Sequence, residues 1–283
     1  MKTGLSMYSL VELYRDKAST AQFLQQAKKW NLEGVELLDY FWQDLDKELP
    51  QVIALTQELG LEVYSYSIGN NFVSSDPAQR QSQVDKIREA VEIAKKLNAK
   101  VIRVFSGDAS GEENVAFDEA LGWIVEGLKA GAALAEKADI TLALENHGLF
   151  AGKAQQVAQV IGAVGSPALA ATLDTGNFLL VGENPTEAVR QLADKAALIH
   201  FKDFKAVGSE VTQRVYKATT GQGYQGTIIG QGDVDLPTIV SILHDRGYNG
   251  YLSIEFEGPG DPLASVEASI NYVNETIAKV KGA

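Results

Sequence analysis

The sequence predicts a single (β/α)8 TIM barrel that spans residues 1–283 as one domain. Eight short apolar segments with strand periodicity alternate with eight longer segments of helical periodicity, and no linker or composition break separates them. Such alternation is typical of a parallel sheet covered by helices, and eight repeats favour a closed barrel over an open sheet. The length of 283 residues also suits this fold, for which about 250 residues are typical.

The expected strands are short runs rich in β-branched and aliphatic residues. Each run is flanked on both sides by residues that favour turns. They cover residues 5–10, 34–40, 61–68, 101–105, 141–148, 170–177, 196–203 and 251–258. Capping residues mark the helices between them, such as Gly60 at the end of one helix and the Asp76-Pro77 pair at the start of the next. The expected helices cover residues 19–31, 45–59, 76–97, 112–138, 153–163, 184–194, 235–247 and 261–281.

Composition limits the partners and the location of the protein. The net charge of −12 repels the phosphates of nucleic acids and anionic lipids, so neither is an expected partner. The chain has no cysteine, which excludes disulfides and thiol catalysis. It has no apolar run near the roughly 18 residues of a membrane span, and its first residues lack the apolar core of a signal peptide. The expected location is the cytoplasm.

Four expected strands end on side chains that bind metal ions. These residues are Glu145, Asp174, His200 and Glu255. The first three are 29 and 26 positions apart, close to the roughly 30 residues of one strand–helix–strand unit, so they fall at the same end of successive strands. Three carboxylates and one imidazole suit a single divalent cation, with Mn²⁺ expected first and Mg²⁺ or Co²⁺ as alternatives. The other interpretation is a set of solvated side chains on the barrel rim.

Five short motifs occur in order along the chain: GVEL at 34–37, LENH at 144–147, LDTGN at 173–177, HFKD at 200–203 and GQGDVD at 230–235. In these motifs the sequence resembles the xylose isomerase-like barrels. That superfamily includes sugar isomerases and epimerases, inosose and dehydroshikimate dehydratases, and apurinic-site endonucleases. The resemblance implies that the four candidate ligands bind one divalent metal. It also implies that Glu145 and Glu255 act as acid and base.

The sequence departs from one branch of this superfamily. Ketose 3-epimerases carry a histidine three positions after the aspartate ligand, where this chain has Asn177. They also carry an arginine several residues after the histidine ligand, where this chain reads FKDFKAVG. The endonuclease branch uses a cluster of metals and more histidines than the three in this chain.

The candidate site is suited to proton transfer next to a carbonyl group. A carbonyl and a neighbouring hydroxyl would chelate the metal, which would stabilise an enediolate when the adjacent C–H loses its proton. The leading hypothesis is therefore a metal-dependent isomerase or epimerase of a sugar or keto-polyol, with proton transfer by two glutamates. A dehydratase of the inosose or dehydroshikimate type is the alternative enzyme. A non-catalytic barrel that binds a sugar is the third hypothesis.

Further polar residues at the strand ends are candidates for substrate binding. His147 lies two positions after a predicted ligand and is expected to contact a substrate hydroxyl, with Asn177 as a second candidate. Lys202 is expected either to bind substrate oxygens or to pair with a carboxylate of the rim. Glu257 is expected either to support the site or to be a solvated residue after the last strand.

Two charged residues belong to earlier strands. Glu36 is expected at the rim, where it would bind substrate or orient a histidine or arginine. Arg103 is a further substrate-binding candidate, but pairing with Glu36 or Glu145 inside the barrel is the favoured interpretation.

The segment 204–235 is long, rich in glycine, and expected to be irregular. Loops of this length are uncommon unless they are functional or disordered. Because the segment would lie on the catalytic rim, a lid or collar over the substrate is one interpretation, and a phosphate site is a variant of it. A contact within a homo-oligomer is the other.

Overall fold

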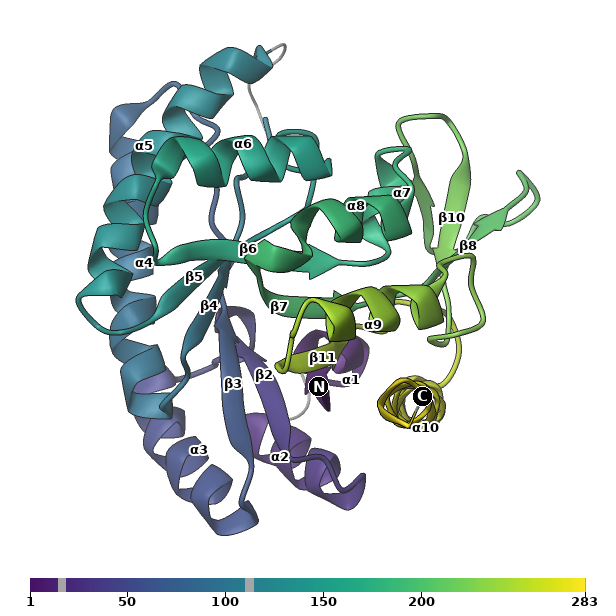
Figure 1. Ribbon diagram of the computed structural model, residues 1–283. Helices are drawn as coiled ribbons and strands as arrows, with labels where there is room; N and C mark the ends of the chain where they lie inside the picture. The colour runs from purple at the N-terminus through teal and green to yellow at the C-terminus, as the bar shows by residue number, and fades with distance from the viewer. Residues whose placement is uncertain (15–18, 110–114, 283) are drawn as a thin grey trace.

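A computed structural model describes residues 1–14, 19–109 and 115–282. Eight parallel strands close into a barrel in the order β1-β11-β7-β6-β5-β4-β3-β2, with β1 paired to β2, as Figure 1 shows. These strands are β1 (Lys2–Ser6), β2 (Gly34–Leu38), β3 (Glu62–Ser67), β4 (Val101–Val104), β5 (Thr141–Glu145), β6 (Leu169–Asp174), β7 (Ala196–Phe201) and β11 (Tyr251–Ile254). The predicted TIM barrel is confirmed.

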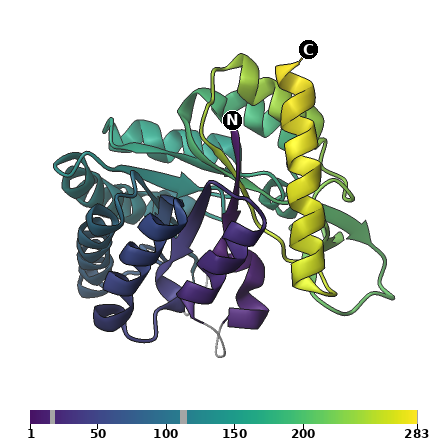
Figure 2. The same cartoon turned by 90° about the horizontal axis from the view of Figure 1, so that it is seen from below.

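Helices surround the barrel and cover the outer faces of its strands (Figures 1 and 2). The principal helices are α2 (Thr20–Lys29), α3 (Leu45–Leu59), α4 (Pro77–Leu97), α5 (Phe117–Glu136), α6 (Ala154–Val164), α8 (Pro185–Leu192), α9 (Leu236–Asp245) and α10 (Pro262–Lys281). Helix α10, yellow in Figure 2, returns the chain to its start, where Lys281 Nζ donates to the carbonyl of Met1 at 3.0 Å.

The capping signals in the sequence set several of these boundaries. Ser19 and Gln22 form a capping box at the start of α2. The Asp76 carboxylate accepts the N–H of Ala78 at the start of α4. Gly60 ends α3 in the left-handed conformation, with φ of 63°. Local chemistry therefore determines where these helices begin and end.

The first strand both begins and ends earlier than the predicted range 5–10, because β1 covers Lys2–Ser6. It ends at Ser6, and the chain turns into η1 (Met7–Leu10) and α1 (Val11–Tyr14). The Ser6 side chain accepts the N–H of Tyr8 and so caps this turn. The apolar residues of 7–10 therefore pack as a helical turn above the barrel instead of extending the strand.

The expected helix 112–138 corresponds to α5. Helix α5 is continuous from Phe117 to Glu136, and residues 112–114 of the expected range lie outside the described part of the chain. Two of its glycines serve close packing. A Cβ at Gly127 would overlap the ring of Phe72, and a Cβ at Gly131 would overlap Ile87.

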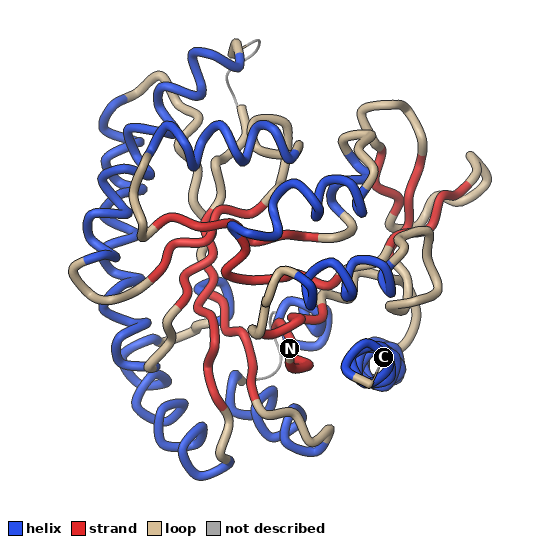
Figure 3. The backbone as a smooth tube through the Cα atoms, in the orientation of Figure 1, coloured by secondary structure: helices blue, strands red, loops and turns tan. Residues whose placement is uncertain are grey.

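The sequence suggested that the segment 204–235 is irregular, but part of it is regular structure. It contains an antiparallel sheet in the order β8-β10-β9, formed by β8 (Phe204–Val207), β9 (Val215–Lys217) and β10 (Gly223–Gly226). We call it the insertion sheet, and Figure 3 shows it beside the barrel strands. After β10 the chain is held by Asp203, whose carboxylate accepts the N–H groups of Gly230, Gly232 and Val234.

Smaller differences concern strand ends. Asn177 does not belong to the sixth strand but begins the short helix α7 (Asn177–Leu180), and Asp39 begins the turn η2 (Asp39–Phe41) after β2. None of the helices in residues 1–14, 19–109 and 115–282 has the length and apolar character needed to span a membrane.

Candidate metal centre

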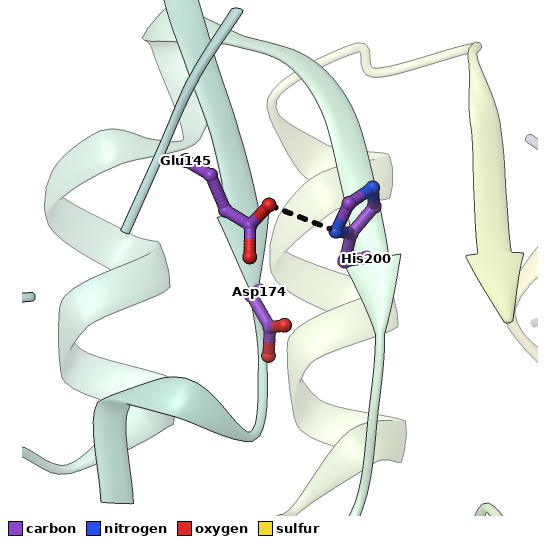
Figure 4. Close-up of side chains that lie close together, drawn as sticks. All are labelled: Glu145, Asp174 and His200. Carbon is purple, nitrogen blue, oxygen red and sulfur yellow. Dashed lines mark ion pairs between the residues drawn. The ribbon is translucent and has the colours of Figure 1, made fainter. Parts of the chain in front are cut away.

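Four adjacent barrel strands place the four predicted ligands at the same end of the barrel. Glu145 and Asp174 are the last residues of β5 and β6, His200 lies near the end of β7, and Glu255 follows β11. Glu145, Asp174 and His200 are buried, and each offers one ligand atom such that these atoms lie within 4.8 Å of one another (Figure 4). Oε1 of Glu255 lies 3.4 Å from Nδ1 of His200.

The carboxylate of Asp174 is oriented by the backbone that follows it. Its Oδ1 accepts the N–H groups of Gly176 and Asn177, each at 2.9 Å. Its Oδ2 makes no hydrogen bond to a described residue, although Nζ of Lys202 lies 2.9 Å away as an ion-pair partner. One oxygen is thus committed to the turn, and the other faces the cluster.

The ring of His200 is held by Glu36. Nε2 of His200 lies 3.0 and 3.1 Å from the two carboxylate oxygens of Glu36, and both side chains are fully buried. A carboxylate accepts a hydrogen bond from the N–H at this ring position, so Nδ1 is left to face the cluster. Nδ1 makes no hydrogen bond within the described chain, and Glu145 and Glu255 oxygens each lie 3.4 Å from it.

Glu145 has partners on both sides. Nε of Arg103 lies 3.1 Å from its Oε2, and the amide of Asn177 donates to its Oε1 at 3.2 Å. Arg103 also donates to the carbonyl of Ile68 at 2.8 Å, and its guanidinium lies 4.0 Å from the centre of the Phe105 ring. Pairing of Arg103 with Glu145 is one of the two arrangements that the sequence suggested.

Lys202 joins three carboxylates. Its Nζ lies 2.9 Å from Asp174 Oδ2, 2.8 Å from Glu255 Oε2 and 2.9 Å from Glu257 Oε1. Only 4% of the lysine side chain is exposed, so these pairs exist in a poorly solvated place where charges interact strongly. The ammonium group therefore offsets much of the negative charge of the site. Of the two roles predicted for Lys202, the pairing with carboxylates is the one observed.

The charges of the site shift several pKa values. Burial raises the pKa of Asp174 to about 6; Lys202 opposes this shift, and the carboxylates of Glu145 and Glu255 add to it. Burial also favours the neutral form of Glu145, but His200 and Arg103 outweigh it and lower its pKa. Burial opposes the charged form of His200, yet the surrounding glutamates raise its pKa well above the usual value.

These groups suit a divalent metal ion. Two buried ligand atoms, Asp174 Oδ2 and His200 Nδ1, lack hydrogen bonds among the described residues and face the same point. Buried polar atoms are normally hydrogen-bonded, so two buried atoms that have only ion-pair partners call for an explanation. Carboxylate oxygens with one imidazole are also a donor set that Mn²⁺, Mg²⁺ or Zn²⁺ accepts.

Two predicted positions need correction or refinement. Glu36 is not a rim residue, because it is fully buried and bonded to Ser67, Ser253 and His200. It therefore occupies the orienting role and not a place in the substrate cavity. His147 lines the cavity above the cluster, as predicted for a substrate contact. Its side chain is about half exposed, and the centre of its ring lies 4.8 Å from the centre of the Phe105 ring.

A cavity of about 570 Å³ opens above the cluster, and we call it the metal cavity. Its lining includes Arg103, Glu145, His147, Lys202 and Glu255. This volume falls in the range of about 300–1,000 Å³ that is usual for small-molecule sites. Five of the nine predicted site residues thus line one cavity large enough for a small substrate, whereas Asp174, His200, Glu36 and Asn177 are not part of its lining.

Two residues that support the centre, Asn146 and Ser253, were not predicted from the sequence. The side chain of Asn146 accepts the N–H of Asp174 at 2.6 Å and donates to its carbonyl at 3.0 Å, so it ties the end of β5 to the end of β6. Ser253 donates to Glu36 at 2.6 Å. An asparagine inside LENH and a serine facing the barrel interior were the available signals, but nothing in the sequence named their partners.

Comparison with known proteins places this geometry in a family. The model of the xylose isomerase-like TIM barrels matches residues 24–276. The chain belongs to the xylose isomerase-like TIM barrel family. The resemblance inferred from the five motifs is therefore confirmed, and the candidate metal centre lies inside the matched region.

The relatives of this xylose isomerase-like barrel include different enzymes. An inosose dehydratase from Clostridium perfringens is 25% identical over 159 residues, which cover 54% of this chain and 53% of the relative. This match spans only about half the length of that dehydratase. A putative L-ribulose-5-phosphate 3-epimerase from Haemophilus influenzae is 25% identical over 211 residues, or 74% of this chain and 70% of the relative.

A solved structure confirms the fold of the family. The IOLI protein, determined with a bound zinc atom, has a TM-score of 0.79 and 17% identity, with 99% of each chain covered. At this identity the likeness concerns the fold alone.

Proposed function

We propose that the protein is a divalent-metal-dependent isomerase or epimerase of a sugar or keto-polyol. The observation that carries the proposal is the convergence of two glutamates, Glu145 and Glu255, on the unbonded Nδ1 of His200. Glu145, Asp174, His200 and Glu255 would hold the metal. The IOLI protein, which has the same fold, was determined with a bound zinc atom, and Mn²⁺ is the expected ion in this protein.

The metal would supply Lewis-acid stabilisation of the negative charge that develops when the carbon next to a carbonyl loses a proton. The protein's own residues supply the remaining functions. Glu145 and Glu255 come from β5 and β11, and β6 and β7 lie between them in the barrel. One carboxylate can take a proton from a substrate carbon while the other returns a proton to the other face or to the neighbouring carbon.

Neighbouring side chains would keep the two glutamates ready for this role. Arg103 and Asn177 orient Glu145, and together with His200, Arg103 keeps this carboxylate ionised and able to accept a proton. Lys202 orients Glu255. His147 lies at the open side of the cavity, where its imidazole would contact a substrate hydroxyl.

A dehydratase remains a second candidate, and one contact favours it. Asn177, which stands where ketose 3-epimerases carry a histidine, is engaged with Glu145 and the carbonyl of Asn146. The inosose dehydratase among the relatives supports the same alternative. Elimination of a hydroxyl would begin with the same proton abstraction and differ only in the later loss of water.

The decisive experiment combines metal analysis with solvent exchange. Protein loaded with Mn²⁺ and desalted should retain about one equivalent of metal. Incubation with ketoses and keto-polyols in deuterated water should then introduce deuterium next to the carbonyl of the substrate. A product of unchanged mass in ordinary water identifies an isomerase or epimerase, and loss of water identifies the dehydratase. Absence of both metal and exchange would refute the proposed function.

A further inference from the structure

A second cavity adjoins the metal cavity. It has a volume of about 270 Å³, and Tyr8 and Glu257 line both cavities. Its wall combines Glu12 from the segment after β1, Arg214 from the turn before β9, Tyr216 from β9 of the insertion sheet, and residues that follow β11. The insertion sheet therefore contributes to a site next to the metal centre, and we call this site the side cavity.

Arg214 fixes the insertion sheet in this place. Its guanidinium lies 3.1 Å from Glu12 Oε1 and donates to the carbonyl of Gly258 at 3.0 Å. Its backbone has a φ of 50°, a left-handed conformation that costs energy for a residue other than glycine. Such a conformation persists only where surrounding contacts hold it, and here those contacts shape the wall of the side cavity.

Ion pairs connect the side cavity to the metal centre. Tyr216 and Glu257 both line the side cavity. Glu257 pairs with Lys202 at 2.9 Å, and Lys202 pairs with Glu255 at 2.8 Å. Because the two cavities share Tyr8 and Glu257 as lining residues, a single ligand can extend from one cavity into the other.

The lining of the side cavity suits an uncharged polyhydroxyl ring. Tyr8, Tyr216 and Phe256 offer aromatic surface, and Glu12 and Glu257 offer oxygens that accept hydrogen bonds from hydroxyls. Sites of this kind combine apolar and aromatic surface with a few polar groups that orient the ligand. The metal cavity alone is already large enough for a small sugar, so the side cavity has room for an additional group.

The charges disfavour a phosphate as that group. Each lysine or arginine of the described part of the chain that lines either cavity has a carboxylate within 3.1 Å: Lys86 with Asp39, Arg103 with Glu145, Lys202 with Glu255, and Arg214 with Glu12. A phosphate would have to compete with a carboxylate for one of these cations. It would also approach the acidic Glu257.

We propose that the side cavity is a glycosyl subsite, so that the substrate is an uncharged keto-sugar that carries a second sugar ring. The second ring lies against Tyr216, and the keto end lies at the metal centre. The position of the keto end rests on the proposed function. Occupation of the side cavity by a neutral ring rests on the contacts described here.

Calorimetry with matched ligands tests this proposal. The probes are fructose, fructose 6-phosphate, and fructose that carries a glucosyl group at its 3-, 4- or 6-hydroxyl, all titrated into the Mn²⁺-loaded protein. At least one glucosyl-fructose should bind tenfold or more tightly than fructose, and fructose 6-phosphate should bind no more tightly than fructose. The proposal fails if no glucosyl-fructose gains tenfold or if the phosphate binds most tightly.

Variants of the cavity lining test whether the glucosyl group gains its affinity in the side cavity. Tyr216→Ala should reduce the glucosyl advantage to less than about threefold, whereas Tyr224→Ala, at the paired position of β10 and outside the cavity lining, should preserve it. Val11→Phe, which enlarges a different lining residue of the side cavity, should reproduce the loss of the glucosyl advantage while Tyr216 and Glu257 stay unchanged. An unchanged advantage in both Tyr216→Ala and Val11→Phe overturns the assignment.

The two proposals fail in different ways. If fructose exchanges deuterium and binds as tightly as every glucosyl-fructose, the metal-dependent function stands and the glycosyl subsite falls. If the protein holds no metal and exchanges no substrate proton, the proposed function falls. Calorimetry with the glucosyl-fructoses then still decides whether the side cavity binds a sugar ring.

Discussion

The carboxylate of Glu36 and Nε2 of His200 lie 3.0 Å apart in the fully buried interior of the barrel, beneath the point where the candidate metal ligands meet. Ser67 and Ser253 donate to the same carboxylate, so its position is fixed independently of the histidine. Glu36 therefore acts as a positioning residue that presents Nδ1 of His200 to the cluster.

Replacement of Glu36 should weaken metal binding without removing any predicted ligand. Mutation of a group that orients a metal ligand typically costs about 10- to 100-fold in affinity. We expect Glu36→Gln to raise the dissociation constant of Mn²⁺ by that factor in a competition titration with a chelator. Glu62→Gln is the matched control, since Glu62 lies on the adjacent strand and contacts Tyr251. Equal affinity in Glu36→Gln and the parent would contradict the positioning role.

The two glutamates should differ from ordinary carboxylates in their effect on turnover. Glu145→Gln and Glu255→Gln keep an oxygen that can coordinate a metal but cannot accept a proton. Because a positioned acid or base contributes about 10²- to 10⁴-fold in rate, each variant should lose at least a hundredfold in turnover at saturating Mn²⁺. Glu33→Gln, which removes an exposed partner of Lys2, serves as the control.

Solvent exchange separates the two roles. Exchange of the substrate C–H with deuterated water should survive in one glutamine variant and disappear in the other, which identifies the base for that direction of reaction. If both variants keep their metal and turn over within tenfold of the parent, the two-glutamate mechanism is wrong.

Metal binding should release protons. Glu255, Glu36 and Glu145 raise the pKa of His200 enough to outweigh the effect of burial, so the metal-free ring is protonated at neutral pH. A metal ion at Nδ1 must displace that proton, and metal affinity therefore rises with pH. Calorimetry in buffers of different ionisation enthalpy should show about one proton released per metal at pH 7.

The number of protons released per metal ion should increase at lower pH. Asp174, with a pKa raised to about 6, also holds a proton in the metal-free protein below that pH. Titrations near pH 5.5 should therefore show more protons released per metal than titrations at pH 7. A release that does not depend on pH, or that is absent, would show that the ligands are already deprotonated.

Loss of Lys202 should destabilise the metal-free protein. Its ammonium group is the shared partner of three carboxylates, and removing one member of a buried ion pair typically costs about 3–5 kcal/mol. Lys202→Met should lower the melting temperature in the presence of a chelator by several degrees. Saturating Mn²⁺ should recover part of the loss, because the cation supplies positive charge to the same carboxylates.

The exposed Lys205, three positions further on in β8, provides the control for this measurement. Lys205→Met should leave the melting temperature within about one degree, since surface substitutions usually change stability by less than about 0.5 kcal/mol. A similar melting temperature for both variants would show that the lysine cluster contributes little to stability.

The sequence alone determined the architecture and the positions of the candidate ligands. Strand periodicity and helix caps depend on neighbouring residues, and both can be read along the chain. Because parallel strands in such a barrel end at the same face, regular spacing of Glu145, Asp174 and His200 predicted their convergence. The LENH, LDTGN and HFKD motifs by themselves indicated the family.

Only the tertiary structure decided the contacts around those ligands. Glu36 lies deep inside the barrel, Lys202 has three carboxylate partners, and Tyr216 lies close to Glu257. Each of these contacts joins residues from different strands, and the relative heights of the strands depend on how the barrel closes. The insertion sheet escaped prediction for a related reason. Its strands are short, and β10 begins and ends with glycine, so their pairing, and with it the side cavity, depends on contacts with the folded barrel and not on local sequence preference.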